Sequence, residues 1–348
     1  MGTHQSKGAT SKKETQFLKI STANSKKLLR KIFKNSASID MSINTSIEAN
    51  SERSSLTNTR TQSSSRTQTQ YMSGKSYYDE KVNYVLPNND DEVDRLHQQH
   101  WILKYIFGCN YHAPIHSLLE KGIKVLDSGC GPATWCFDMA EAYPNSKFQG
   151  IDISRVFPES IKPINVEFVN GNIAQLLPFD DNTFDYIHQR LLVGGLTHTD
   201  WENNLKEIYR VLKPGGYVEF AEPDIKDQIN PGPLIQKTQS TMTNMLLSRN
   251  MCPKIAVELN EKLAAAGFED ITVIEKELPM GHNEKKGELW WQDYKHTTQN
   301  LRPAMSMVNP ELEDPEKFAS FLDECRQECV ANKTSFRWVV TYAQKYKI

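Results

Sequence analysis

The stretch that decides the fold runs from Val125 to Thr134 and reads V-L-D-S-G-C-G-P-A-T. Its apolar start predicts a strand, its two glycines predict a tight turn, and Thr134 opens a helical pattern. Glycine permits such a turn and lets a ligand approach the backbone closely. Ligands of open α/β sheets bind at the carboxyl ends of the strands, so this turn is the first candidate binding site.

Short apolar runs alternate with helical patterns on both sides of this turn. Such alternation is typical of a doubly wound α/β fold, in which helices cover both faces of a mostly parallel sheet. Gly215 and Gly216 are expected to end the helix before the fifth strand, because glycine is common just past a helix C-terminus. The predicted strands are 124–127, 147–151, 166–169, 184–188, 217–221, 271–278 and 336–344, and the predicted helices are 91–107, 134–143, 201–212 and 254–266.

Two carboxylates and one missing glycine indicate what the turn binds. A dinucleotide fingerprint would place a third glycine where Thr134 stands, so that a pyrophosphate can reach the helix N-terminus. Asp127, directly before the turn, suits a positively charged ligand better than an anionic one, and S-adenosylmethionine carries a sulfonium and no phosphate. Asp152, at the end of the second predicted strand, is placed to accept both ribose hydroxyls of an adenosine; a turn residue is the alternative interpretation.

Five short motifs in a fixed order resemble those of the class I S-adenosylmethionine-dependent methyltransferases. Together they cover most of residues 120–222. The stretches 84–88, 94–100 and 188–190 are further similar to a fungal subgroup that includes regulators of secondary metabolism. The resemblance implies a Rossmann-like sheet of seven strands in the order 3-2-1-4-5-7-6, with strand seven antiparallel. The motifs are 125–131, 150–154 (G-I-D-I-S), 171–173 (G-N-I), 177–185 (L-P-F-D-D-N-T-F-D) and 211–216 (V-L-K-P-G-G).

The same resemblance implies which residues hold the cofactor. Asp127 would hold the ammonium group of the methionine moiety, Asp152 would bind the ribose, and Ile153 would pack on the adenine. Asn172 stands where the family often has an aspartate, and its amide oxygen can still accept the adenine amino group. The implied cofactor-binding set is Asp127, Ser128, Gly129, Gly131, Asp152, Ile153, Asn172, Ile173 and His188.

The catalytic residues are harder to assign, because methyl transfer needs a general base only if the acceptor must lose a proton. His188 and Glu222 follow the fourth and fifth strands and are the candidates. A cofactor-positioning role is the alternative for His188, and capping of the next segment is the alternative for Glu222. Arg190 is a candidate for positioning an acidic acceptor. The acceptor pocket is expected between helix 91–107 and the segment 225–255, whose methionine-rich stripe is otherwise typical of core.

The predicted function is methyl transfer to a small-molecule or protein acceptor that the sequence does not identify. The alternatives are a cofactor-binding regulator with weak or lost catalysis and an NAD-dependent oxidoreductase, and Thr134 counts against the second. Nucleic acid is disfavoured as substrate, because the chain after residue 75 is acidic and residues 188–191 (H-Q-R-L) replace the N-P-P-Y or D-P-P-Y motif of enzymes that methylate nucleic-acid amino groups. The six scattered cysteines predict free thiols and no metal site.

Residues 1–76 differ from the rest of the chain. Residues 1–75 carry 13 Lys and Arg against 4 Asp and Glu, whereas the remainder carries 28 against 39. The polar composition of 36–76 predicts a disordered tail before a domain spanning 77–348. The start M-G-T-H-Q-S fits the pattern for myristoylation of Gly2, and the basic stretch 26–34 is a candidate for binding an anionic membrane or for nuclear import. The expected location is the cytoplasm, peripheral on a membrane if Gly2 is acylated, with the nucleus as the alternative.

Overall fold

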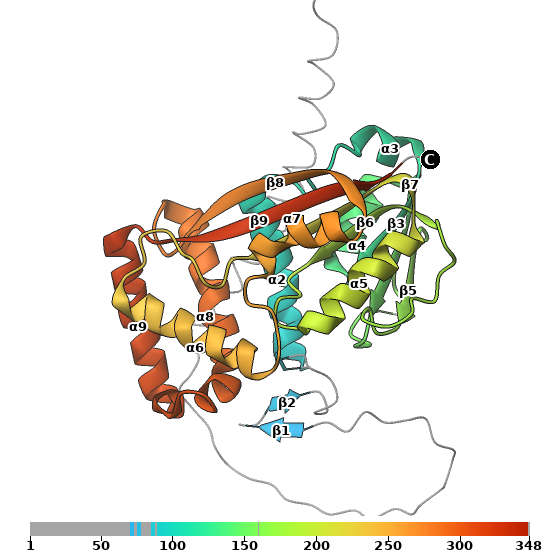
Figure 1. Ribbon diagram of the computed structural model, residues 1–348. Coiled ribbons are helices and arrows are strands. Elements are labelled where there is room, and N and C mark those ends of the chain that lie inside the picture. Colours follow the sequence, from blue (N-terminus) through green and yellow to red (C-terminus); the bar gives the residue numbers. More distant parts are fainter. Residues whose placement is uncertain (1–69, 73–74, 78–84, 88, 159, 347–348) are drawn as a thin grey trace, which may run out of the picture. The chain divides into compact units, whose positions relative to one another are not determined.

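The computed structural model describes residues 70–72, 75–77, 85–87, 89–158 and 160–346 (Figure 1). All of them belong to one compact unit, Arg66–Ile348. The predictions for Gly2, for the basic stretch 26–34 and for the disordered tail fall almost entirely outside the described residues. At the start of the described part, β1 (Gln70–Met72) and β2 (Lys75–Tyr77) form a two-stranded antiparallel ribbon of their own.

The centre of the fold is a seven-stranded sheet in the order β5-β4-β3-β6-β7-β9-β8. Counted along the chain this is 3-2-1-4-5-7-6, the order that the resemblance implied. β9 alone runs antiparallel to the other six strands of this sheet. The strands are β3 (Lys124–Ser128), β4 (Lys147–Asp152), β5 (Val166–Asn170), β6 (Phe184–Arg190), β7 (Leu212–Pro223), β8 (Phe268–Pro279) and β9 (Ser335–Lys345).

Helices cover both faces of this sheet, and the strand period of two decides which core each residue enters. Val125 of β3 lies in one buried cluster with α4, and its neighbour Leu126 lies in the other with α5 and α7. In Figure 1, α6, α8 and α9 gather beyond one end of the long strands β8 and β9. The helices are α2 (Asp90–Phe107), α3 (His116–Lys121), α4 (Thr134–Ala142), α5 (His198–Val211), α6 (Pro233–Ser248), α7 (Ile255–Ala265), α8 (Glu284–Ser306) and α9 (Pro315–Asn332), with a 3-10 turn at Pro310–Leu312.

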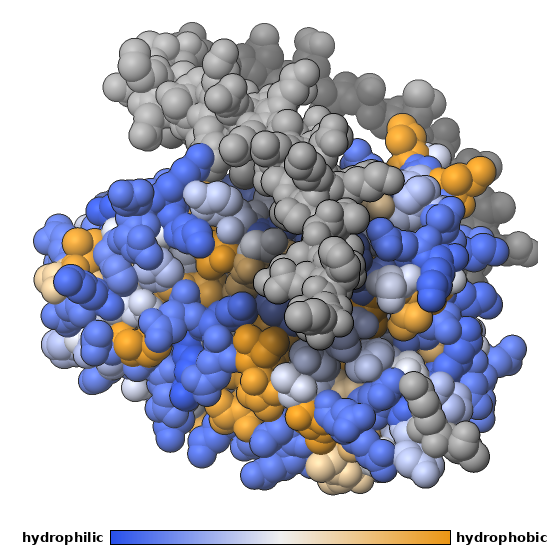
Figure 2. Space-filling model, turned by 90° about the horizontal axis from the view of Figure 1, so that it is seen from above, coloured by the Kyte–Doolittle hydropathy of each residue, from blue (hydrophilic) through white to orange (hydrophobic). Residues whose placement is uncertain are grey.

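Figure 2 shows one face, on which hydrophilic side chains predominate and apolar side chains gather near the middle. Among the described residues, no helix has both the length and the apolar character needed to cross a membrane.

The prediction that Gly215 and Gly216 end the helix before the fifth strand of the sheet is wrong. Helix α5 ends at Val211, and Leu212 already has extended backbone angles. Both glycines lie inside β7, where Gly215 has a φ of +77°. A Cβ on Gly216 would lie 2.9 Å from the carbonyl oxygen of Asp185 on β6. The glycines are therefore needed where β7 begins to pair with β6, and the register between these strands shifts at this point.

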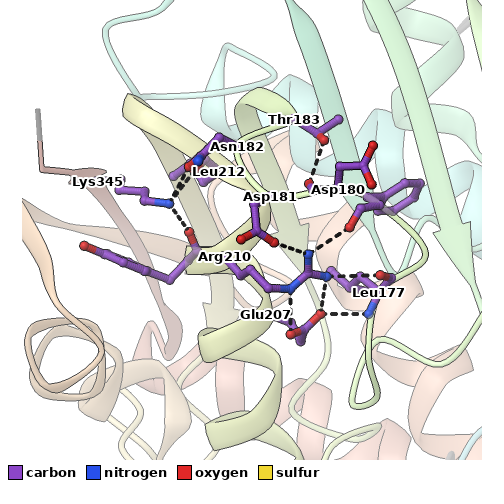
Figure 3. A network of polar contacts seen from close by, with 11 residues as sticks. Leu177, Asp180, Asp181, Asn182, Thr183, Glu207, Arg210, Leu212 and Lys345 are labelled. Carbon is purple, nitrogen blue, oxygen red and sulfur yellow. Dashed lines mark hydrogen bonds and ion pairs between the residues drawn. The ribbon is translucent and has the colours of Figure 1, made fainter. Parts of the chain in front are cut away.

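The family-like motif 177–185 has a structural role that Figure 3 makes visible. The guanidinium of Arg210 on α5 donates to the carbonyl oxygens of Phe179 (2.8 Å) and Leu177 (3.1 Å). It also pairs with Glu207 (2.7 Å) and Asp181 (2.8 Å). One cation thus fixes the turn that leads into β6, the strand whose end carries part of the site described below.

The N-terminal helix α2 is fixed to α8 by a buried polar cluster. Arg95 donates to Glu92 (2.6 Å) and to Asp293 of α8 (2.9 Å). Gln99 donates to Asp293 (2.8 Å), and Asn300 of α8 donates to Glu92 (2.7 Å). All five side chains are at least nine-tenths buried. This cluster holds two carboxylates around one guanidinium and sets the position of α2.

Replacing Arg95 by methionine should destabilise the protein by about 3–5 kcal/mol, because it leaves two buried carboxylates without their cation. The free energy of unfolding in urea measures the change. The control is Lys295→Ala, which breaks a solvent-accessible ion pair between α8 and Asp323 of α9 and should cost less than about 1 kcal/mol. Equal losses in the two variants would contradict the role given to Arg95.

Candidate functional site

The candidate site is a cavity of about 240 Å³ at the carboxyl ends of β3, β4 and β6. This is the edge of a parallel sheet at which ligands of α/β proteins bind. Its walls are the glycine loop, the segments after β4, β5 and β6, and one side of α2. The residues that line it include Glu92, Val93, Leu96, Gln99, Asp127, Gly129, Gly131, Asp152, Ile153, Asn172, Ile173, Arg190, Leu192, Leu196 and Asp200.

The glycine loop is shaped by two residues in the left-handed region, Gly129 (φ +74°) and Gly131 (φ +51°). The N–H groups of Gly129 and Cys130 both donate to the carbonyl oxygen of Ile151 on β4, at 2.8 and 3.1 Å. A Cβ on Gly131 would meet nothing within 4 Å, so this glycine leaves open space at the cavity. The predicted binding loop is thus an actual wall of the cavity.

Asp152 links the glycine loop to β4. Its Oδ2 accepts the N–H of Gly131 (2.8 Å), and its Oδ1 accepts the N–H (2.8 Å) and the hydroxyl (2.5 Å) of Ser154. Burial raises the pKa of this half-buried carboxyl above its usual range. Each carboxylate oxygen has more than one acceptor site, so Asp152 can serve the loop and still accept hydroxyls of a ligand.

The three residues that were predicted to meet the adenine all line the cavity. Ile153 is 40% exposed, which is unusual for a large apolar residue that lines a cavity. Ile173 is buried below the surface and lines the same space. The Asn172 side-chain oxygen accepts the N–H of Ala174 (2.9 Å), so one of its two acceptor sites is left for a ligand.

Asp127 and His188 form a buried pair on adjacent strands. Asp127 Oδ1 lies 3.0 Å from His188 Nδ1, and Asp127 Oδ2 accepts from the Cys136 thiol (3.4 Å). The His188 ring stacks on Trp135 with a centroid distance of 4.0 Å and an angle of 1°. Asp127 lines the cavity and His188 does not. This geometry favours the positioning role of His188 over the catalytic one.

Two other predicted site residues lie behind the cavity wall. Ser128 is fully buried and donates to Gln189 (2.8 Å). Glu222 is also fully buried, and its carboxylate accepts the N–H groups of Leu192 (2.8 Å) and Val193 (3.0 Å). Burial raises the pKa of Glu222 to about 8. Glu222 therefore fixes the backbone of the loop after β6 through these hydrogen bonds, and it does not line the cavity.

Of the two segments that were expected to form the acceptor pocket, one lines the cavity. Helix α2 lines the cavity as predicted, but the segment 225–255 does not. Met242, Met245 and Met251 of that segment are at least nine-tenths buried in the larger core cluster. The opposite wall is the loop after β6, which includes Leu192 and Leu196. The chain offered no periodic signal for this loop, because its apolar residues follow directly on a strand.

The chemistry of the cavity is decided by its charges. Asp127 and Asp152 stand on neighbouring strands, and Arg190 is the cation among the described lining residues. Asp200 also lines the cavity, but its carboxylate is engaged in a capping box with Thr197 at the start of α5. No group of three or more possible metal ligands occurs among the described residues.

Comparison with known proteins agrees with this geometry. Residues 125–216 match the family described as "Methyltransferase domain". The chain carries a methyltransferase domain. An N-methyltransferase of Clonostachys rogersoniana (verN) is 26% identical over 79% of this chain and 97% of its own length. The secondary metabolism regulator LAE1 of Cochliobolus heterostrophus is 29% identical over 54% of this chain and 63% of its own length.

A solved structure of phosphoethanolamine N-methyltransferase 2 from Haemonchus contortus, in complex with S-adenosyl-L-methionine, is 18% identical. The matched region covers 78% of this chain and 62% of the chain in that structure, with a TM-score of 0.44. The prediction of a class I S-adenosylmethionine-dependent methyltransferase that resembles fungal secondary-metabolism proteins is confirmed by the domain match and the fungal relatives. Nothing in these comparisons supports an oxidoreductase.

The buried Glu222 predicts a specific pH dependence of stability. In the folded protein its pKa is about 8, against an ordinary value of 4.5. The folded state therefore holds a proton that the unfolded state releases, and stability is lost as the pH rises from about 4.5 to 8. The slope from this group is at most about 1.4 kcal/mol per pH unit.

In Glu222→Gln this contribution disappears, so the variant should gain stability relative to the wild type as the pH rises from 5 to 8. Urea unfolding at several pH values measures the difference between the two proteins. A difference that stays constant with pH would contradict the buried, protonated state of Glu222. Glu261→Ala, an exposed change on α7, is the control and should show no such trend.

Proposed function

We propose that this methyltransferase transfers the methyl group of S-adenosylmethionine, bound in the cavity, to a nitrogen atom of a small-molecule acceptor. The observation that carries the proposal is the set of complementary groups at one sheet edge. Asp152 offers acceptors for ribose hydroxyls, the half-exposed Ile153 offers an apolar surface for adenine, and Asp127 offers a carboxylate for an ammonium group. When bound, the cofactor supplies an electrophilic methyl carbon on a sulfonium.

The residues of the chain then contribute alignment and exclusion of water. Asp152 and the loop N–H contacts fix the nucleoside end before any ligand arrives. Val93 and Leu96 of α2 face the same cavity as Leu192 and Leu196 of the loop after β6. These four side chains form apolar walls on which an acceptor can pack. A substrate held in a fixed orientation in a dry site reacts without the entropic cost of a bimolecular encounter.

A nitrogen acceptor is consistent with a cavity that offers no evident general base. Among the described residues that line it there is no histidine or lysine to act as a base, and burial raises the pKa of the lining Cys130 thiol well above its ordinary value. Glu92 is held by Arg95 and Asn300, and Asp200 is held by its capping box. A neutral amine attacks through its own lone pair and loses its proton after transfer. The printed name of the Clonostachys relative, an N-methyltransferase, supports the same acceptor atom.

A second candidate function is a regulator that binds the cofactor with weak or lost catalysis. The similarity to the secondary metabolism regulator of Cochliobolus favours it. So does the position of His188 and Glu222 outside the cavity. This candidate predicts cofactor binding without S-adenosylhomocysteine formation on any amine, whereas the enzyme predicts turnover on at least one.

Calorimetric titration tests the cofactor site. The wild type should bind S-adenosylmethionine saturably and should not bind NAD. Asp152→Ala should weaken binding by about 10- to 100-fold, because charge-assisted hydrogen bonds to the ribose and the loop are lost. Asp152→Asn, which keeps one acceptor, should lose less, and Glu261→Ala should bind like the wild type. Binding that is equal in the wild type and Asp152→Ala would contradict the site.

A further inference from the structure

We propose that Arg190 binds the carboxylate of the cofactor's methionine moiety and that His100 is the residue that positions it. The inference rests on the proposed function and deepens it, since it concerns the amino-acid end of the same cavity. The sequence suggested Arg190 only as a contact for an acidic acceptor, and it gave no role to His100.

Arg190 is anchored by His100, a residue that does not line the cavity. Its Nη2 lies 2.9 Å from His100 Nδ1 on α2. The other ring nitrogen, Nε2, lies 3.0 Å from Asp138 Oδ2 on α4. Asp138 also accepts from Lys104 (2.6 Å) and from Asn110 (2.8 Å). The chain of contacts runs from the cavity through α2 to α4 and ends at the half-exposed Lys104.

The hydrogen bonds assign the proton on the His100 ring. A guanidinium can only donate, so Nδ1 must accept from Arg190 through its lone pair. Nε2 must then carry the proton and donate it to Asp138. A doubly protonated ring would face a cation with no acceptor. Burial of the ring, with Arg190 and Lys104 nearby, lowers the pKa of His100 to about 4, so the neutral tautomer is present at neutral pH.

The bond to His100 uses one nitrogen of the guanidinium, and the Arg190 side chain makes no other hydrogen bond to the described residues. Arg190 ends β6 and lines the cavity together with Asp127 of the adjacent strand β3. No ion pair between these two side chains occurs in the described part of the chain, although the charge of Asp127 raises the pKa of Arg190. Burial lowers that pKa further than the carboxylate raises it. A carboxylate ligand would form charge-assisted hydrogen bonds with this buried guanidinium and would stabilise its charge.

Two opposite charges that share a cavity without pairing are complementary to a zwitterion. The ammonium group of an amino acid would lie at Asp127, and its carboxylate would lie at Arg190. S-adenosylmethionine presents this pair of charges at the end opposite its adenine, which the open Ile153 and Asp152 accommodate. A carboxylate on the acceptor would use Arg190 alone and would leave Asp127 without a ligand charge.

Two ligands that differ only at the amino-acid end test the proposal by calorimetry. S-adenosylhomocysteine carries the amino-acid group, and 5′-methylthioadenosine replaces it with a methyl group. In the wild type the first should bind at least about tenfold more tightly. Arg190→Met should lose most of this preference while its dissociation constant for methylthioadenosine stays within about twofold of the wild type. Unchanged methylthioadenosine binding also shows that the variant is folded.

His100 is tested by two variants with the same pair of ligands. His100→Phe keeps the ring shape and removes both nitrogens, so it should lose a large part of the preference for S-adenosylhomocysteine. His100→Asn places an amide oxygen near the former Nδ1 and should restore part of it. A merely structural role of His100 would weaken both ligands equally, and that result would overturn the positioning role.

The outcomes separate this inference from the proposed function. If the wild type binds neither ligand, the cofactor site itself fails. If the wild type prefers S-adenosylhomocysteine and Arg190→Met keeps that preference, the guanidinium does not hold the methionine carboxylate, and the inference is overturned while the cofactor site stands. Loss of both ligands in Asp152→Ala shows that the assay reports on the cavity.

Discussion

One carboxylate, that of Asp152, joins the two strands on which the whole site is built. It accepts the N–H of Gly131 from the loop after β3, although the carboxylate itself stands at the end of β4. With the paired contacts to the Ile151 carbonyl oxygen, this bond holds a loop with two left-handed residues in place over the sheet edge. The cavity is therefore formed before a ligand binds, and its nucleoside end has a fixed shape. The other contacts proposed for the cofactor depend on the fixed position of this loop and of Asp152.

The remaining polarity follows from the sheet order. Parallel neighbours bring their carboxyl ends to the same edge, so β3 supplies Asp127, β4 supplies Asp152 and β6 supplies Arg190 to one space. Helix α2 closes this space and has two separate anchors. Arg95 binds this helix to α8 through a buried ionic cluster. His100 makes one hydrogen bond to Arg190 and another to Asp138 of α4. The helix that is proposed to form the acceptor wall thus also contacts, through His100, the guanidinium that is proposed to bind the cofactor.

The sequence was sufficient for the elements with strong local signals. The strand order was predicted correctly. The glycine loop, Asp127, Asp152, Ile153 and Asn172 line one cavity, and the sequence could single them out because each lies at or just after a strand end within a recognisable motif. The pair Gly215 and Gly216 was wrongly predicted to end a helix, because glycines after a helix also fit a strand that needs a positive φ at Gly215 and a close approach to its neighbour at Gly216. The anchor of Arg190 was missed because His100 lies 90 residues earlier in the chain and on another element. Long-range polar contacts of this kind leave no periodic trace in a sequence.

The most direct test of the account is a crystal structure of the protein with S-adenosylhomocysteine. The account predicts the adenine between Ile153 and Ile173, the ribose hydroxyls on Asp152, and the amino-acid group between Asp127 and Arg190. The thioether sulfur should then lie toward the space between α2 and the loop after β6. A ligand bound outside this cavity, or bound in it with the adenine beside Arg190, would contradict the account.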